Sequence, residues 1–227
     1  MSVIVFDVNE TLLDLGGLDS LFADEFGDAA LRPQWFATMV QLSFVGGLTG
    51  QYVDFSTAAR AALQMTAERA GRGIAAGAVE TVVAGMRRLP PHPDVMPALT
   101  RLRDAGLRLI ALTNSVLEVA EAQLSYAGLA DLFEGVYSAD EVRALKPFAA
   151  PYLMVADQCG VDIGELCLVA AHSWDVSGAL AAGAQAAFVG RGGAVPSPLG
   201  AQPAVIGADL EIVADALLAG RVNARSC

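Results

Sequence analysis

Polar side chains follow several apolar runs of this sequence, at places where strands of a sheet would end. The first apolar run, residues 3–6, leads directly into Asp7. A carboxylate in such a place can act as a nucleophile or as a general acid or base. Asp7 could equally cap the turn after the strand, and these residues alone leave both readings open. The other polar residues close to predicted strand ends are Thr11, Thr113, Asn114, Lys146, His172, Ser173 and Asp175.

Each of these residues alone has a common structural explanation. Thr113 or Asn114 could cap a helix, and Lys146 could be an ordinary surface lysine. Their joint occurrence carries more weight, because the carboxyl ends of parallel strands meet at one edge of a sheet and ligands bind there. The pattern therefore predicts one site that combines two acids, a lysine and a hydroxyl–amide pair.

The elements that would position these residues alternate between helix and strand from Asp94 onward. Helices are predicted at 95–105, 117–127, 150–159, 176–182 and 209–218, and strands at 107–112, 135–137, 166–170, 186–189 and 204–206. Helices that alternate with strands are typical of a parallel sheet covered on both faces.

Residues 15–90 have a different pattern. Their apolar residues recur at intervals of three and four, the spacing of amphipathic helices, and no strand pattern interrupts them. We therefore predict an α/β core domain formed by residues 1–14 and 91–227, with a helical cap domain, 15–90, inserted after the first strand. Trp35, Phe36 and Phe44 could line the mouth of the site, pack inside the cap or form a dimer surface.

Composition and charge exclude several functions. The chain has 227 residues, of which 54% are hydrophobic and 17% charged, as expected of a packed globular protein. Its net charge of −11 argues against a nucleic-acid partner. No apolar run is long enough for a membrane span and no secretory signal is visible, so we expect no membrane partner and a cytoplasmic location. Cys159, Cys167 and Cys227 are expected to be free thiols.

The polar motifs resemble those of the haloacid dehalogenase superfamily, and within it the type II L-2-haloacid dehalogenases. The matching segments are FDVNETL at 6–12, LTNS at 112–115, LKP at 145–147 and HSWD at 172–175, followed by the small-residue stretch 178–183. The resemblance extends over nearly the whole chain. It implies a Rossmann-like α/β core with a helical cap, a small carboxylic acid as substrate and a homodimer.

The resemblance also implies roles for individual residues. Asp7 would be a nucleophile that forms an ester intermediate, which water then cleaves. Lys146 would keep Asp7 ionised, and Asp175 would position Lys146 or the hydrolytic water. Tyr152 could equally be an aromatic residue on a buried helix face, and His172 a structural residue or a general base. The residues expected to hold the substrate or the reacting carboxylate are Asn9, Thr11, Thr113, Asn114, Tyr152, His172 and Ser173.

Two positions distinguish carbon–halogen hydrolysis from phosphoryl transfer. Phosphatases of the superfamily place a second acid two residues after the nucleophile, where this chain has Asn9, and a magnesium-binding acid where it has Ala171. An amide has no titratable proton to give a leaving alcohol, and magnesium prefers carboxylate ligands. We therefore predict a 2-haloacid hydrolase without a metal or cofactor. The alternatives are a magnesium-dependent phosphatase and a catalytically weak ligand-binding homologue.

The chain also departs from the dehalogenase pattern. The resemblance places a cap arginine, which would bind halide and carboxylate, at the position of Gly46. Arg32 and Arg60 could substitute for it, although their spacing gives no support. Ala170 and His172 stand where the dehalogenases usually have serine and asparagine.

Overall fold

The computed structural model describes residues 3–220, and a six-stranded parallel sheet lies at its centre. The strand order is β3-β2-β1-β4-β5-β6, so β1 is an inner strand. Phe6, the last residue of β1, pairs with Ala111 of β2 and Val169 of β4, which brings the ends of these three strands together. The strands are β1 (Val3–Phe6), β2 (Arg108–Thr113), β3 (Gly135–Ser138), β4 (Leu166–Ala170), β5 (Gln185–Val189) and β6 (Val205–Gly207).

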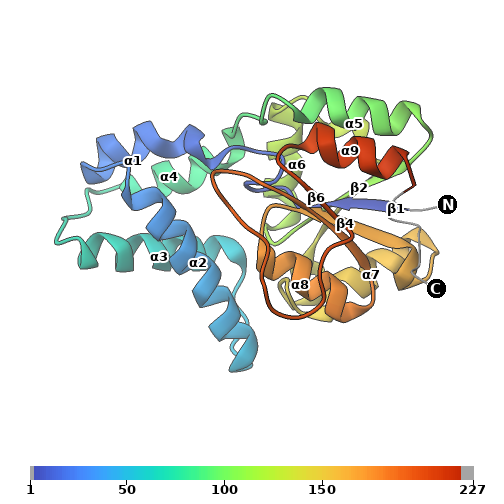
Figure 1. Ribbon diagram of the computed structural model, residues 1–227. Helices are drawn as coiled ribbons and strands as arrows, with labels where there is room; N and C mark the ends of the chain where they lie inside the picture. Colours follow the sequence, from blue (N-terminus) through green and yellow to red (C-terminus); the bar gives the residue numbers. More distant parts are fainter. Residues whose placement is uncertain (1–2, 221–227) are drawn as a thin grey trace.

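Alternate residues of the strands face two separate hydrophobic clusters. In β1, Val3 and Val5 belong to one cluster and Ile4 and Phe6 to the other. This follows from the period of two along a strand that is buried on both faces. The first cluster is covered by α7 (Ala149–Cys159) and α8 (Ser173–Ala182), and the second by α5 (Val95–Asp104), α6 (Leu117–Tyr126) and α9 (Leu210–Leu218). Figure 1 shows α5 and α9 on one side of the sheet and α7 and α8 on the other. The predicted α/β fold class is confirmed.

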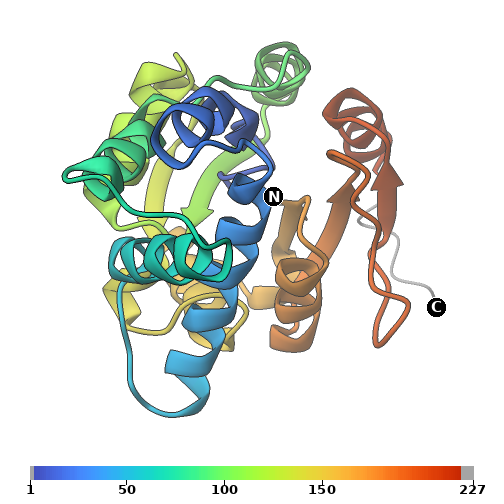
Figure 2. The same ribbon diagram turned by 90° about the vertical axis from the view of Figure 1, so that its left-hand side faces the viewer.

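Four further helices lie together beside the sheet (Figures 1 and 2). They are α1 (Asp19–Phe26), α2 (Leu31–Leu48), α3 (Phe55–Arg69) and α4 (Ala78–Gly85), and we call them the cap helices. Short 3-10 helices, Leu15–Leu18 and Met86–Arg88, lead into and out of them. Trp35 is fully buried among these helices, where its ring packs against Phe22 and its Nε1 donates to the carbonyl of Ala59. Of the three alternatives for Trp35, the structure therefore shows packing inside the cap.

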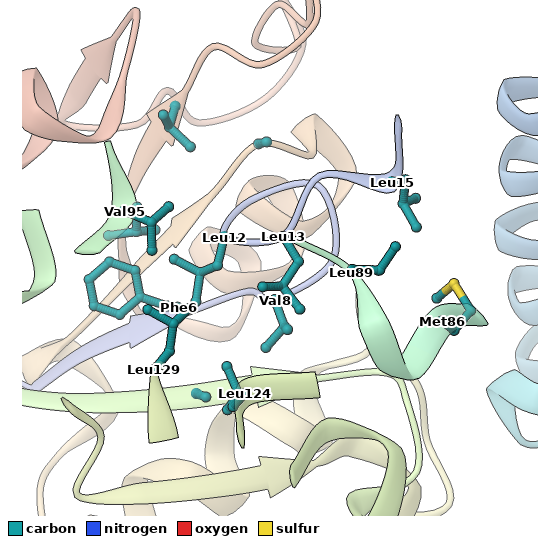
Figure 3. Packing of buried hydrophobic residues seen from close by; sticks show 14 of the residues in the cluster. Phe6, Val8, Leu12, Leu13, Leu15, Met86, Leu89, Val95, Leu124 and Leu129 are labelled. Atoms are coloured by element: carbon teal, nitrogen blue, oxygen red, sulfur yellow. The ribbon is translucent and has the colours of Figure 1, made fainter. Parts of the chain in front are cut away.

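The chain segment that follows β1 is held by apolar packing. Val8, Leu12 and Leu13 are fully buried, and Figure 3 shows them beside Met86 and Leu89 of the segment that returns from the cap helices. The N–H of His92 donates to the carbonyl of Leu12, and the N–H of Asp14 to that of Pro90. The outgoing and returning segments therefore run side by side, which fixes the loop that carries Asp7 and Thr11.

Most predicted elements agree with the structure to within one residue at each end. The main exception is α8, which begins at Ser173 rather than at 176, because the N–H groups of Asp175 and Val176 both donate to the carbonyl of His172. Asp175 therefore lies in the first turn, where the helix dipole favours an acid.

Two other expectations concern membrane-spanning helices and the cysteines. Within residues 3–220, no helix has the length and apolar character to cross a membrane. Cys159 and Cys167 are free and buried, whereas Cys227 lies outside the described residues.

Candidate active site

Asp7 lies directly after β1 and is 4% exposed. Its two oxygens have different partners. Oδ1 accepts a hydrogen bond from Nζ of Lys146 at 2.8 Å. Oδ2 accepts from Oγ1 of Thr11 at 2.6 Å and lies 3.0 Å from Nδ1 of His172. Three residues from different parts of the chain thus meet at the carboxylate of Asp7.

Lys146 is fully buried, and its ammonium group joins the two acids of the site. Besides Asp7, Nζ donates to Oδ2 of Asp175 at 2.6 Å and to the carbonyl of Leu112 at 2.9 Å. An ammonium group has three protons, so all of its donors are used. The buried cation of Lys146, in the segment before α7, therefore joins the carboxyl ends of β1 and β2 to the first turn of α8.

The charges of the site are set by burial and by this contact. Burial alone would raise the pKa of Asp7, but the Lys146 ammonium and the hydrogen bond with His172 outweigh it and hold that pKa well below its usual 3.8. Burial alone would lower the pKa of Lys146, and the two carboxylates raise it instead. For Asp175, burial outweighs the lysine and raises the pKa. Asp7 is therefore the carboxylate that stays ionised most easily.

Tyr152 and Asn114 hold the neighbours of Asp7 in place. The hydroxyl of Tyr152 donates to Oδ1 of Asp175 at 2.5 Å, and Tyr152 is itself buried. Asn114 accepts from the backbone N–H of Lys146 at 2.7 Å and donates to its carbonyl at 3.2 Å. Tyr152 thus holds Asp175 and Asn114 holds Lys146, whereas the hydrogen bonds of the Asp7 carboxylate come from Thr11, Lys146 and His172.

Of three further residues predicted to bind substrate, Asn9 and Thr113 have hydrogen-bond partners other than Asp7. Asn9 donates from Nδ2 to Ser115 and accepts at Oδ1 from Gln123, because a buried amide needs partners for both its ends. Oγ1 of Thr113 accepts from the N–H of Ser115 and is fully buried. Ser173 begins α8 and is partly exposed.

The structure adds four residues that the sequence did not single out as site residues. Ser115 and Gln123 orient Asn9, and Gln123 also donates to the carbonyl of Met86. Phe36 of α2 and Trp174 of α8 stack on the ring of His172, with centroid distances of 5.5 and 4.9 Å. Trp174 lies within the fourth motif, and a place for Phe36 at the mouth of the site was one of the three alternatives that the sequence left open.

The structure leaves little space for a side chain at Gly46, where the resemblance places an arginine. Gly46 is near the end of α2, where a Cβ would lie 2.8 Å from the backbone oxygen of Gln51, so a side chain has no room there. Phe36 is instead the cap residue that contacts the His172 ring. The two suggested substitutes are engaged elsewhere: Arg32 with Asp19 and Glu10, and Arg60 with Glu80.

Gly178 allows α8 to approach the turn that carries Lys146. A Cβ at this position would lie 2.6 Å from the backbone oxygen of Pro147 and 2.5 Å from its Cβ. We expect Gly178→Ala to lower the free energy of unfolding by about 1–3 kcal/mol, because neither backbone can give way cheaply. Urea denaturation measures this. Ser177→Ala, one residue earlier on the same helix, is the control and should change stability by less than about 0.5 kcal/mol. Equal stability of the two variants would contradict the close approach.

The fold and this arrangement of acids and lysine define a hydrolase class. The chain belongs to the haloacid dehalogenase-like hydrolase family, whose sequence model matches residues 1–183. The chain is 28% identical over 204 residues to an (S)-2-haloacid dehalogenase of Pseudomonas sp. (strain YL), an alignment that covers 88% of this chain and 87% of the relative.

Solved structures of L-2-haloacid dehalogenases also match this chain over nearly its whole length. The structure of the L-2-haloacid dehalogenase from Xanthobacter autotrophicus, solved with chloropropionic acid covalently bound, matches with a TM-score of 0.87 and 25% identity over 96% of this chain and 98% of that one. A further L-2-haloacid dehalogenase matches with a TM-score of 0.90 and 27% identity, covering 95% of this chain and 97% of the other.

Proposed function

We propose that this hydrolase removes halide from a small 2-haloacid, with Asp7 as the nucleophile. The observation that carries the proposal is that Asp7 is an ionised carboxylate at the end of β1 and that its two oxygens accept different numbers of hydrogen bonds. Each carboxylate oxygen can accept about two in-plane hydrogen bonds. Oδ2 of Asp7 has two partners and Oδ1 has one, so an electron pair of Oδ1 stays open for attack.

The first step forms an ester. The open pair of Oδ1 attacks carbon 2 of the acid, the carbon–halogen bond breaks, and the halide leaves with the bonding electrons. Lys146 favours this step because its positive charge keeps Asp7 in the carboxylate form. Because its pKa is low, Asp7 stays an anion. The buried site excludes water from this anion, which makes the carboxylate a stronger nucleophile than it would be in solution.

The same contacts favour a reaction without a metal. The ammonium of Lys146 already lies between Asp7 and Asp175, where a metal ion would otherwise bridge two acids. Ala171 offers no side-chain ligand, and its N–H donates to Thr11. Within residues 3–220, no group of three metal-binding side chains occurs. Asn9, at the position where the phosphatases have a general acid, is an amide that Ser115 and Gln123 hold in place. It cannot protonate a leaving alcohol.

Incubation with 2-chloropropionate in the presence of a chelator tests this function. We expect stoichiometric chloride and lactate in the absence of any divalent cation. A panel of phosphate esters with magnesium is the matched arm for the phosphatase alternative. No chloride release, together with magnesium-dependent release of phosphate, would reject the proposal in favour of that alternative.

Residues 15–90 are proposed to form a cap domain that closes over Asp7, in a protein that forms a homodimer. Cap–core contacts join α2 to α8, through Phe36 with His172 and Phe44 with Trp174. A sedimentation experiment at micromolar concentration that detects only monomer would reject the dimer.

Because Phe36 rather than Gly46 faces the site, the substrate carboxylate lacks a cap arginine. We expect Phe36→Arg to lower the KM for 2-chloropropionate about 10- to 100-fold, since a charge-assisted hydrogen bond is worth about 1.5–3 kcal/mol. Gly46→Arg is the comparison: it should leave KM unchanged and lower stability by about 1–3 kcal/mol, because its Cβ meets the backbone of Gln51. A gain of affinity in Gly46→Arg alone would show that the cap faces the site differently.

A further inference from the structure

We propose that His172 and Thr11 together form an oxyanion hole for the second half of the reaction, in which water cleaves the ester on Asp7. This inference rests on the proposed function and assigns the two oxygens of Asp7 different tasks. Oδ1 attacks the substrate and becomes the ester oxygen, while Oδ2 becomes the carbonyl oxygen of the ester. Negative charge then develops on Oδ2, where both donors already point.

The directions of the two donors follow from their other contacts. Oγ1 of Thr11 accepts a hydrogen bond from the N–H of Ala171 at 2.9 Å, so its own proton is free to point at Oδ2. Asp7 is ionised, and a carboxylate only accepts hydrogen bonds. Nδ1 of His172, 3.0 Å from Oδ2, must therefore carry a proton and donate it.

The ring of His172 is held in the orientation that this task requires. It stacks on Phe36 at an interplanar angle of 26° and on Trp174 at 21°. The His172 side chain is only 14% exposed. A donor that is fixed before the charge develops stabilises it without reorganisation, which is the main source of oxyanion stabilisation in enzymes.

In the second step, water cleaves the ester and regenerates the carboxylate of Asp7. The oxygen of a water molecule bonds to Cγ of Asp7, and the electrons of the carbon–oxygen double bond move to Oδ2, which is stabilised by His172 and Thr11. The double bond re-forms as the Cγ–Oδ1 bond breaks. Oδ1 leaves as the hydroxyl oxygen of the 2-hydroxyacid and takes one proton of the water. The second proton passes to solvent, which matches the halide released in the first step.

Two substitutions of His172 separate this role from a purely structural one. His172→Phe keeps an aromatic ring between the stacking partners and removes the N–H donor. His172→Asn removes the ring and keeps an amide donor at a similar distance from the backbone. With 2-chloropropionate, His172→Phe should release about one equivalent of chloride in a burst and then turn over about 10²–10³-fold more slowly than the unchanged protein, the usual cost of one oxyanion donor.

Mass spectrometry of the intact protein identifies the species that accumulates. We expect His172→Phe to carry one esterified propionate and His172→Asn to keep faster turnover with little ester. Thr11→Val, which loses the other donor, should also accumulate ester. A role of His172 in packing alone would give the reverse order, with His172→Phe close to normal and His172→Asn impaired.

The outcomes distinguish the inference from the function on which it rests. If the unchanged protein releases no chloride, the proposed function fails. If it does and His172→Phe turns over slowly without an ester or a burst, His172 acts before ester formation and the oxyanion assignment is wrong. Thr11→Val keeps the inference testable should His172→Phe not fold, because turnover without accumulated ester would also overturn it.

Discussion

Replacement of Asp7 by asparagine is expected to reduce chloride release from 2-chloropropionate by about 10⁴-fold or more, the scale seen when a nucleophile is removed from an enzyme. The amide keeps the shape of the carboxylate and can still accept from Lys146, but it has no anionic electron pair for attack. Steady-state chloride release is the measurement.

The matched control for Asp7→Asn is Asp131→Asn, an exposed acid in the short helix Ala130–Leu132. It should retain full activity and stability. If Asp7→Asn released chloride at a rate similar to that of the control, another group would be the nucleophile and the assignment of Asp7 would fail.

Replacement of Lys146 by methionine should have two large effects. Lys146 is the only lysine of the chain, and it is the cation that holds both acids. Its loss leaves Asp7 and Asp175 buried without a counter-charge, which should lower the free energy of unfolding by about 3–5 kcal/mol. The pKa of Asp7 should then rise, because His172 would still oppose the effect of burial but the Lys146 ammonium would not. We expect chloride release to fall by about 10³-fold.

The double variant Lys146→Met with Asp175→Asn separates the two effects. Removing the second buried charge should recover part of the stability and none of the activity. Urea denaturation and chloride release measure these quantities. If Lys146→Met alone retained both stability and activity, the buried ammonium would not be the group that controls Asp7.

The proximity of Asp7, Lys146 and Asp175 agrees with the sequence prediction, because the topology of the sheet brings strand ends together. Asp7 is fixed at a strand end by the burial of the four residues before it, and parallel pairing places the ends of β1 and β4 side by side. Once the strands are recognised, the proximity of Asp7 and Asp175 follows. Lys146 belongs to no strand or helix, so strand pairing does not place it, and its inclusion rested on its nearness to a predicted strand end and on the motif resemblance.

The contacts between cap and core could not be predicted in this way. Their geometry depends on how α2 lies against the core, which no local pattern specifies. A Cβ on Gly47 would meet the ring of Phe148, and these residues are far apart in sequence. The position of Phe36 over His172 depends on such contacts, so the sequence could only name it as one alternative.

The direction in which the buried side chain of Asn9 points could not be predicted from the sequence either. Asn9 lies two residues after the proposed nucleophile and was expected to contact the substrate. It is turned toward Ser115 and Gln123, because an unpaired buried amide would cost about 1–3 kcal/mol for each lost partner. Gln123 lies on α6 and carries no motif of its own.

The central claim is that Asp7 becomes covalently bonded to the substrate, and an oxygen-exchange experiment tests it most directly. The protein, in excess over 2-chloropropionate, reacts in water enriched in heavy oxygen, and both the lactate and the peptide that contains Asp7 are weighed by mass spectrometry. The account predicts unlabelled lactate from this single turnover and heavy oxygen in the side chain of Asp7. Labelled lactate together with an unlabelled Asp7 would mean that water attacks the substrate directly, and would contradict it.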